Sequence, residues 1–136
     1  MLEQVEIDGQ VAGIILRSDY HTPGISFFTP DEYSQQLAYI SHPAGKEIEP
    51  HTHNEVERSV IRTQEVLVIK KGVLRVTFYN DEQCAVAQRD LAQGDVILLA
   101  SGGHGFEVIE DVALIEIKQG PYLGDDDKQR FLPRTA

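Results

Sequence analysis

Three histidines and one glutamate in this sequence have the residue types and spacing of a metal site. His51 and His53 are two residues apart after the extended lead-in Ile48-Glu49-Pro50, and a strand places residues i and i+2 on the same face. Glu65 opens a run, EVLVIKK, with the alternation of a strand, and His104 stands among glycines further along the chain. Two imidazoles on one strand, a carboxylate on a neighbouring strand and a third imidazole form a mixed nitrogen and oxygen set that suits a divalent first-row metal ion.

The predicted site is mononuclear, and its ligands are His51, His53, Glu65 and His104. Three neutral imidazoles and one carboxylate leave net positive charge on a divalent ion, and a five- or six-coordinate ion keeps positions open to water or substrate. These ligands do not choose among Fe, Mn, Ni, Zn and Cu, because all five ions accept such a set. We therefore expect one divalent metal ion as cofactor and leave its identity open.

The order of these residues resembles the two motifs of the cupin superfamily. The first motif is G, five residues, HxH, three or four residues, E, six residues, G, and the similar stretch here is Gly45, five residues, His51-x-His53, then Glu65, six residues and Gly72. The second motif has a similar stretch in Gly94-Asp95 through Gly102 and His104. The resemblance covers about residues 36–118 and implies a double-stranded β-helix, the jelly-roll barrel of cupins, with a metal ion inside it.

Glu57 competes with Glu65 for the role of carboxylate ligand. Glu57 satisfies the motif's count of three or four residues after His53, whereas eleven residues separate His53 from Glu65. Only Glu65, however, begins a strand that ends in a glycine at the required distance, Gly72. We therefore choose Glu65 as the ligand, which makes residues 54–64 an inserted loop.

Arg58 and Arg62 lie in this inserted loop, close in sequence to the metal ligands. Solvated surface charge is the ordinary role of a single arginine. On an acidic chain, though, two arginines beside a metal site also suit a carboxylate or a phosphate, which the guanidinium fork binds in two places. We predict that Arg58 and Arg62 bind the anionic group of a substrate.

The fold class that the sequence predicts is all-β, with a short helical turn at most. Turn and breaker residues recur every eight to twelve residues, which is the spacing of short strands. One domain is expected, in three parts: residues 1–36 form an N-terminal hairpin and loop, residues 37–119 form the barrel core, and residues 120–136 form a C-terminal tail. Residues 31–36 are the stretch expected to form the helical turn.

Two further hairpins are predicted, one over residues 65–79 about Lys71-Gly72 and one over residues 106–118 about Glu110-Asp111. One face of the first carries Glu65 beside five apolar side chains, Leu67, Ile69, Leu74, Val76 and Phe78. An unpaired buried charge costs several kcal/mol, on the order of the stability of a domain, so Glu65 needs a partner such as a metal ion. The other face mixes charged side chains with Val66, Val68 and Val73, which predicts a second layer or a homodimer interface.

Composition narrows the range of partners. The 136 residues include 22 acidic and 12 basic ones, for a net charge of −10, with no basic stripe. Nucleic acids and anionic membranes are therefore excluded as expected partners. Cys84 is the only cysteine, and the N-terminal residues MLEQVEIDG lack the basic and apolar regions of a signal peptide. We expect a cytoplasmic protein that binds a small molecule and forms a homodimer, built partly on the face of Val66, Val68 and Val73.

Two functions remain open on the sequence alone. The first is a metal-dependent enzyme that acts on a small anionic, oxygen-rich molecule, such as a hydroxy acid, a keto acid or a sugar derivative, with oxygenase or isomerase chemistry. The second is a non-catalytic cupin that binds a small molecule or a metal ion. The ligand count favours the enzyme, because a structural zinc site fills its tetrahedron with protein ligands. Beyond those ligands, no residue is marked in the sequence as the acid or base of a reaction.

Overall fold

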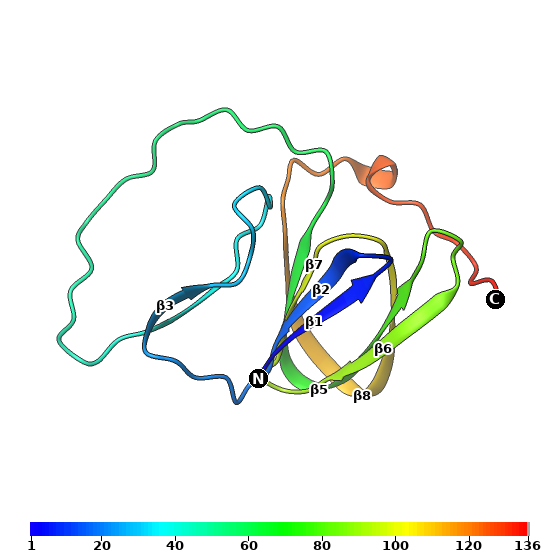
Figure 1. Ribbon diagram of the computed structural model, residues 1–136, viewed down its shortest axis with the longest axis horizontal. Helices are drawn as coiled ribbons and strands as arrows, with labels where there is room; N and C mark the ends of the chain where they lie inside the picture. The colour runs from blue at the N-terminus through cyan, green and yellow to red at the C-terminus, as the bar shows by residue number, and fades with distance from the viewer. Residues whose placement is uncertain (136) are drawn as a thin grey trace.

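A curled antiparallel sheet of six strands forms the body of the protein, and a two-stranded hairpin stands apart from it (Figure 1). The structure is a computed structural model that describes residues 1–135. Its elements are β1 (Leu2–Ile7), β2 (Gln10–Leu16), β3 (Gly24–Phe27), β4 (Ala38–Ser41), β5 (Glu65–Tyr79), β6 (Ala85–Leu91), β7 (Val96–Leu99), β8 (Gly103–Lys118) and the 3-10 turn η1 (Gly124–Asp127). The predicted all-β class is confirmed.

The sheet has the order β1-β2-β7-β5-β6, and β8 pairs with β5 along its whole length. β3 and β4 form the separate hairpin. β1 and β2 form the predicted N-terminal hairpin, with its turn at Asp8-Gly9, but residues 31–36 form turns and not a helical turn. In residues 1–135, no helix is long and apolar enough to span a membrane.

β5 is one bent strand and not the hairpin that the sequence predicts. Its first half pairs with β7 and with the end of β8, and its second half pairs with β6 and with the start of β8. β8 is likewise a single strand through Glu110-Asp111. The turn signal at Lys71-Gly72 is real but produces a bend, because each half of β5 finds its hydrogen-bonding partners in other strands.

Gly72 makes this bend possible. Its φ is +81°, which favours glycine, and a Cβ on this residue would collide with the backbone carbonyl of Asp111 and lie 2.9 Å from the carbonyl oxygen of Glu110. Gly9 has a similar φ of +79°, with nothing within 4 Å of its Cβ position.

We therefore expect Gly72→Ala to lower the free energy of unfolding by about 3 kcal/mol, and Gly9→Ala by only about 1 kcal/mol. Both variants carry the cost of a left-handed backbone, so the difference isolates the collision with β8. Urea denaturation of the two variants measures it. Equal losses would mean that β5 and β8 can separate at the bend without cost.

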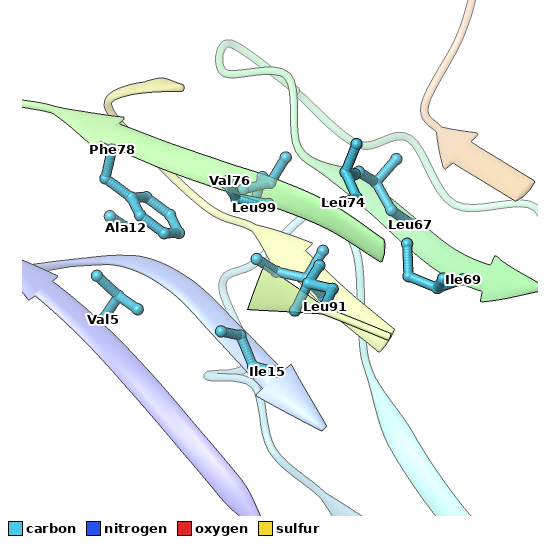
Figure 2. Packing of buried hydrophobic residues seen from close by; sticks show 11 residues of the cluster. Val5, Ala12, Ile15, Leu67, Ile69, Leu74, Val76, Phe78, Leu91 and Leu99 are labelled. Carbon is cyan, nitrogen blue, oxygen red and sulfur yellow. The ribbon is translucent and has the colours of Figure 1, made fainter. Parts of the chain in front are cut away.

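The core fills the inside of the curl (Figure 2). All five apolar side chains predicted for the inner face of β5 are buried there. They pack with residues from the neighbouring strands, Val5, Ala12, Ile15, Leu91, Ile97 and Leu99. The inner face of β5 was thus predictable from the alternation of its apolar side chains, although the predicted hairpin is wrong.

A second, smaller cluster covers part of the outer face. Val66 is buried there with Ile14, Leu98 and Ala100, beneath side chains of the connection between β3 and β4 that include Phe28 and Leu37. Val68 and Val73 are partly buried. The expected second layer is therefore present over Val66 and comes from the chain itself.

Residues 42–64, between β4 and β5, contain no helix or strand. This segment arcs away from the body of the protein and returns to it at the start of β5 (Figure 1). The strand predicted around His51 and His53 is therefore not formed in this structure. A stretch of this length without secondary structure is uncommon in a compact domain and is usually either a functional loop or a linker segment.

Candidate functional site

A pocket of about 730 Å³ opens where the two ends of the β5–β8 ladder meet the C-terminal segment. Glu65 and Tyr79 of β5 and His104, Phe106 and Glu116 of β8 line it. Residues 127–131 form the facing wall. Phe131 closes one side by packing edge-to-face on Tyr79, with ring centroids 5.2 Å apart.

Glu65 and His104, two of the four predicted ligands, are brought together in this pocket. Oε1 of Glu65 lies 3.7 Å from Nε2 of His104. The two residues belong to opposite ends of the ladder, since Glu65 pairs with Lys118 and His104 pairs with Phe78. The bend at Gly72 curls the ladder so that its ends face each other. The bend at Lys71-Gly72, which the sequence predicts as a hairpin turn, thus brings the two ends of the ladder together at the site.

The spacing and solvation of this pair fit a metal ion. Two ligands about 2.1 Å from the same ion lie roughly 3–3.5 Å from each other, close to the observed 3.7 Å. The side chains are only 18% exposed for Glu65 and 26% for His104. Burial, followed by the charge of Lys128, lowers the pKa of His104, which keeps the imidazole neutral and its lone pair free to coordinate.

Glu116 is a site residue that the sequence reading missed. It lies on β8 opposite Leu67 of β5, and its side chain lines the pocket next to Glu65. Burial, together with the hydrogen bond and the charge of Glu116, raises the pKa of Glu65 to about 7. The alternation of Leu114, Glu116 and Lys118 with isoleucines could have indicated this inner face.

His51 and His53 lie elsewhere, in the exposed segment 42–64. Their rings are 5.3 Å apart, and Nδ1 of His51 lies 2.9 Å from the carbonyl oxygen of Glu49. Within residues 1–135, no group of three or more His, Cys, Asp or Glu side chains is arranged to hold a metal ion. The structure thus contains the predicted quartet as two separate pairs.

Arg58 and Arg62, the predicted anion-binding residues, are exposed and do not line the pocket. The backbone carbonyl oxygen of Arg62 accepts a hydrogen bond from the Gln119 side chain at 2.8 Å. The cations that line the pocket are Lys128 and Arg130. They come from the C-terminal segment, whose lack of periodicity hid them from sequence reading.

Glu57, the competing carboxylate, is also exposed and lies outside the pocket. Glu65, in contrast, lies 3.7 Å from His104. Comparisons with protein-family models, with curated proteins and with solved structures find no match for this chain. Its chemistry is therefore inferred from the residues of the pocket.

The metal-free protein should lose stability as the pH rises because of Glu65. Its folded pKa of about 7 lies above the usual value of 4.5, so the folded state binds this proton more tightly than the unfolded state. This proton therefore stabilises the folded state. The stabilisation is fully present below pH 4.5 and is lost as the pH rises through 7. The lowered pKa of His104 has the opposite effect, because it makes the folded protein less stable as the pH falls below 6.5.

Glu65→Gln removes the Glu65 contribution alone. In the presence of a chelator, the melting temperature of this variant relative to the wild type should increase between pH 5 and pH 8, by an amount equivalent to about 2 kcal/mol. Glu57→Gln removes the same charge from an exposed site and serves as the control. A difference in melting temperature between Glu65→Gln and the wild type that stays constant from pH 5 to pH 8 would contradict the raised pKa of Glu65.

Proposed function

We propose that the chain is a cupin-type metal protein in which His51 and His53 join Glu65 and His104 around one divalent ion. The observation that carries this proposal is the Glu65–His104 pair, held 3.7 Å apart in the wall of a pocket. In the proposed state, residues 45–53 form a strand that closes the sheet into a double-stranded β-helix. A bound ion would polarise a carbonyl or hydroxyl oxygen of the substrate.

The chain's own residues then determine what the pocket accepts. Lys128 and Arg130 place positive charge at a pocket of a protein whose net charge is −10, which favours a small anion with a carboxylate or phosphate group. If the segment of Arg58 and Arg62 closes over the pocket with the histidines, those two residues reach the same anion. Tyr79 and Phe131 exclude water from one side.

Glu116 supplies the acid or base that the sequence alone left unnamed. Its carboxyl group faces the same pocket as Glu65 without being one of the four proposed ligands. A carboxyl group at that position can hold or accept a proton next to the ion. The reaction class that fits is oxygenation or isomerisation of a hydroxy acid, a keto acid or a sugar derivative in the cytoplasm.

The alternative is a binding protein that holds a metal ion or a small molecule without turnover. Reconstitution of the metal-free protein with Fe(II), Mn(II), Ni(II) and Zn(II) in turn separates the two functions. Each form is screened against small acids and sugar phosphates for oxygen uptake, product formation and thermal shift. Turnover with one metal that disappears in Glu116→Gln and His104→Ala establishes the enzyme. Thermal stabilisation without turnover under every metal favours the binding protein.

A further inference from the structure

We propose that a second pocket, separate from the first pocket of Glu65 and His104, binds a small anion with a carboxylate or phosphate group through Arg62. This second pocket has a volume of about 230 Å³ and lies where the start of β2, the end of β7 and the lead into β5 meet. The site needs neither a metal ion nor a movement of residues 42–64. It is therefore independent of the proposed metal site.

Residues 61–65 separate the two pockets. Ile61, Thr63 and Glu65 line the first pocket, whereas Arg62 and Gln64 line the second. Successive side chains of an extended chain point to opposite sides, which accounts for this alternation. Arg62 therefore lies on the side away from the first pocket.

The backbone at Arg62 is held in place by Gln119, the residue after β8. The side-chain amide of Gln119 donates to the carbonyl oxygen of Arg62 at 2.8 Å and accepts from the backbone N–H of Gln64 at 3.2 Å. Gln64 is buried, and its side-chain oxygen accepts from the backbone N–H of Gln35 at 3.1 Å. The main chain that carries Arg62 is thus fixed to the sheet, so an anion that binds there does not have to order it.

The guanidinium of Arg62 is free to bind a ligand. Arg17, Arg75 and Arg89 each form an ion pair with a carboxylate. Within residues 1–135, Arg62 forms no ion pair, and its only hydrogen bond is the one that its carbonyl oxygen accepts. All of its side-chain donors are therefore available in the second pocket.

The lining of the second pocket has no acidic residue in the part of the chain that the structure describes. This is notable on a chain with a net charge of −10. The first pocket, by contrast, places three carboxylates beside its two cations. An anion in the second pocket thus meets one positive charge and neutral polar groups, with no carboxylate in the lining to repel it.

Tyr33 can add a neutral donor to the site. Its ring packs against the second cluster, and its side chain lines the second pocket. Among the described residues, the hydrogen bonds of Tyr33 involve only its backbone, so its hydroxyl hydrogen is free to donate. Ser101 has a different role, because its hydroxyl donates to the carbonyl oxygen of Val11 at 2.8 Å and joins the end of β7 to β2.

A carboxylate or a phosphate is the group that this lining fits. The guanidinium fork donates two parallel hydrogen bonds to either group, and the Tyr33 hydroxyl can donate a third. The second pocket is smaller than the roughly 300–1,000 Å³ that is typical of sites for drug-sized ligands. The ligand is therefore a small oxyanion, either free phosphate or a small carboxylic acid.

Nuclear magnetic resonance titration of the isotope-labelled wild type tests the site, with inorganic phosphate as the probe and ionic strength held constant with sodium chloride. The backbone amide signals of residues 10–11 and 100–101, which line the second pocket, should shift along one saturating curve. Those of residues 128–131 in the first pocket should not. A parallel titration with acetate identifies which of the two oxyanions binds more tightly. Shifts confined to residues 128–131, or shifts that do not saturate with either probe, would overturn the proposal.

Arg62→Gln should raise the dissociation constant of the bound oxyanion at least about tenfold, because it removes charge-assisted hydrogen bonds. Arg58→Gln is the matched control, since it removes the same charge from the same exposed segment and lines neither pocket. Lys128→Gln removes a cation of the first pocket. Both of these variants should bind the oxyanion like the wild type.

Tyr33→Phe provides a test that leaves the charge of the protein unchanged, and it should weaken binding roughly threefold through the loss of one neutral hydrogen bond. Equal weakening by Arg62→Gln and Arg58→Gln would show that net charge alone attracts the oxyanion. Weakening by Lys128→Gln without any effect of Arg62→Gln would place the oxyanion in the first pocket. Either result would overturn the second site and leave the proposed metal site untouched.

Discussion

Glu65→Gln is expected to weaken metal binding by at least about tenfold. The amide has the shape of the carboxylate but no charge, and its oxygen is a weaker ligand for a divalent ion. The effect should be large because the Glu65 side chain is only 18% exposed, so little water is available to replace the lost ligand. Competition with a chromophoric chelator measures the affinity of each variant.

Glu57→Gln is the matched control, since Glu57 is exposed and lies outside the pocket. Its metal affinity should stay close to that of the wild type. The reverse ranking would move the carboxylate ligand into residues 54–64 and contradict the assignment. Glu65→Gln should also stabilise the metal-free protein above pH 7, because burial and Glu116 penalise the ionised Glu65. Loss of binding together with a gain in stability is the mark of a residue kept for function.

Asp95→Ala is expected to destabilise the protein by about 3–5 kcal/mol, through an unrelated part of the fold. Oδ1 of Asp95 accepts a hydrogen bond from the backbone N–H of Ser18 at 2.9 Å. Oδ2 accepts from the backbone N–H of Ala92 at 2.8 Å and from Nη1 of Arg17 at 3.0 Å. Because Asp95 is buried, its removal leaves a guanidinium and two N–H groups without this acceptor.

Asp90→Ala provides the comparison, since Asp90 forms a two-point pair with Arg75 at 2.8 Å and 3.0 Å on the exposed surface. Its loss should cost about 0–1 kcal/mol. Urea denaturation of both variants gives the two values, and similar values would contradict a structural role for Asp95. The Gly94-Asp95 pair, read in the sequence as part of a cupin-like motif, thus has a physical task in holding the turn before β7.

The inner face of β5 was predictable because alternation reports burial whatever the partner strand. The hairpins about Lys71-Gly72 and Glu110-Asp111 were not, since a local turn signal does not say whether the chain reverses or bends. That choice depends on the pairing of β5 with β8, which are distant in sequence. Among the candidate ligands, Glu65 and His104 lie together in the structure, and their role as metal ligands stays a prediction.

The remaining parts of the site depend on tertiary contacts that the sequence pattern does not encode. Glu116 faces Glu65 because the β5–β8 register places it opposite Leu67, two residues from Glu65 on the same face, and Lys128 and Arg130 reach the pocket through an irregular tail. The positions of His51 and His53 follow from spacing only if residues 45–53 are a strand. In the structure these residues form no strand, so the histidines stay a prediction about the closed barrel.

Metal content of protein purified without an affinity tag tests the proposed site most directly. Elemental analysis should find about one divalent ion per chain in the wild type, and a large loss of that ion in both His51→Ala and His104→Ala. His51 lies in the segment 42–64 and His104 lies in the pocket, which the structure holds apart. Retention of the metal at wild-type stoichiometry in both variants would contradict the four-residue site.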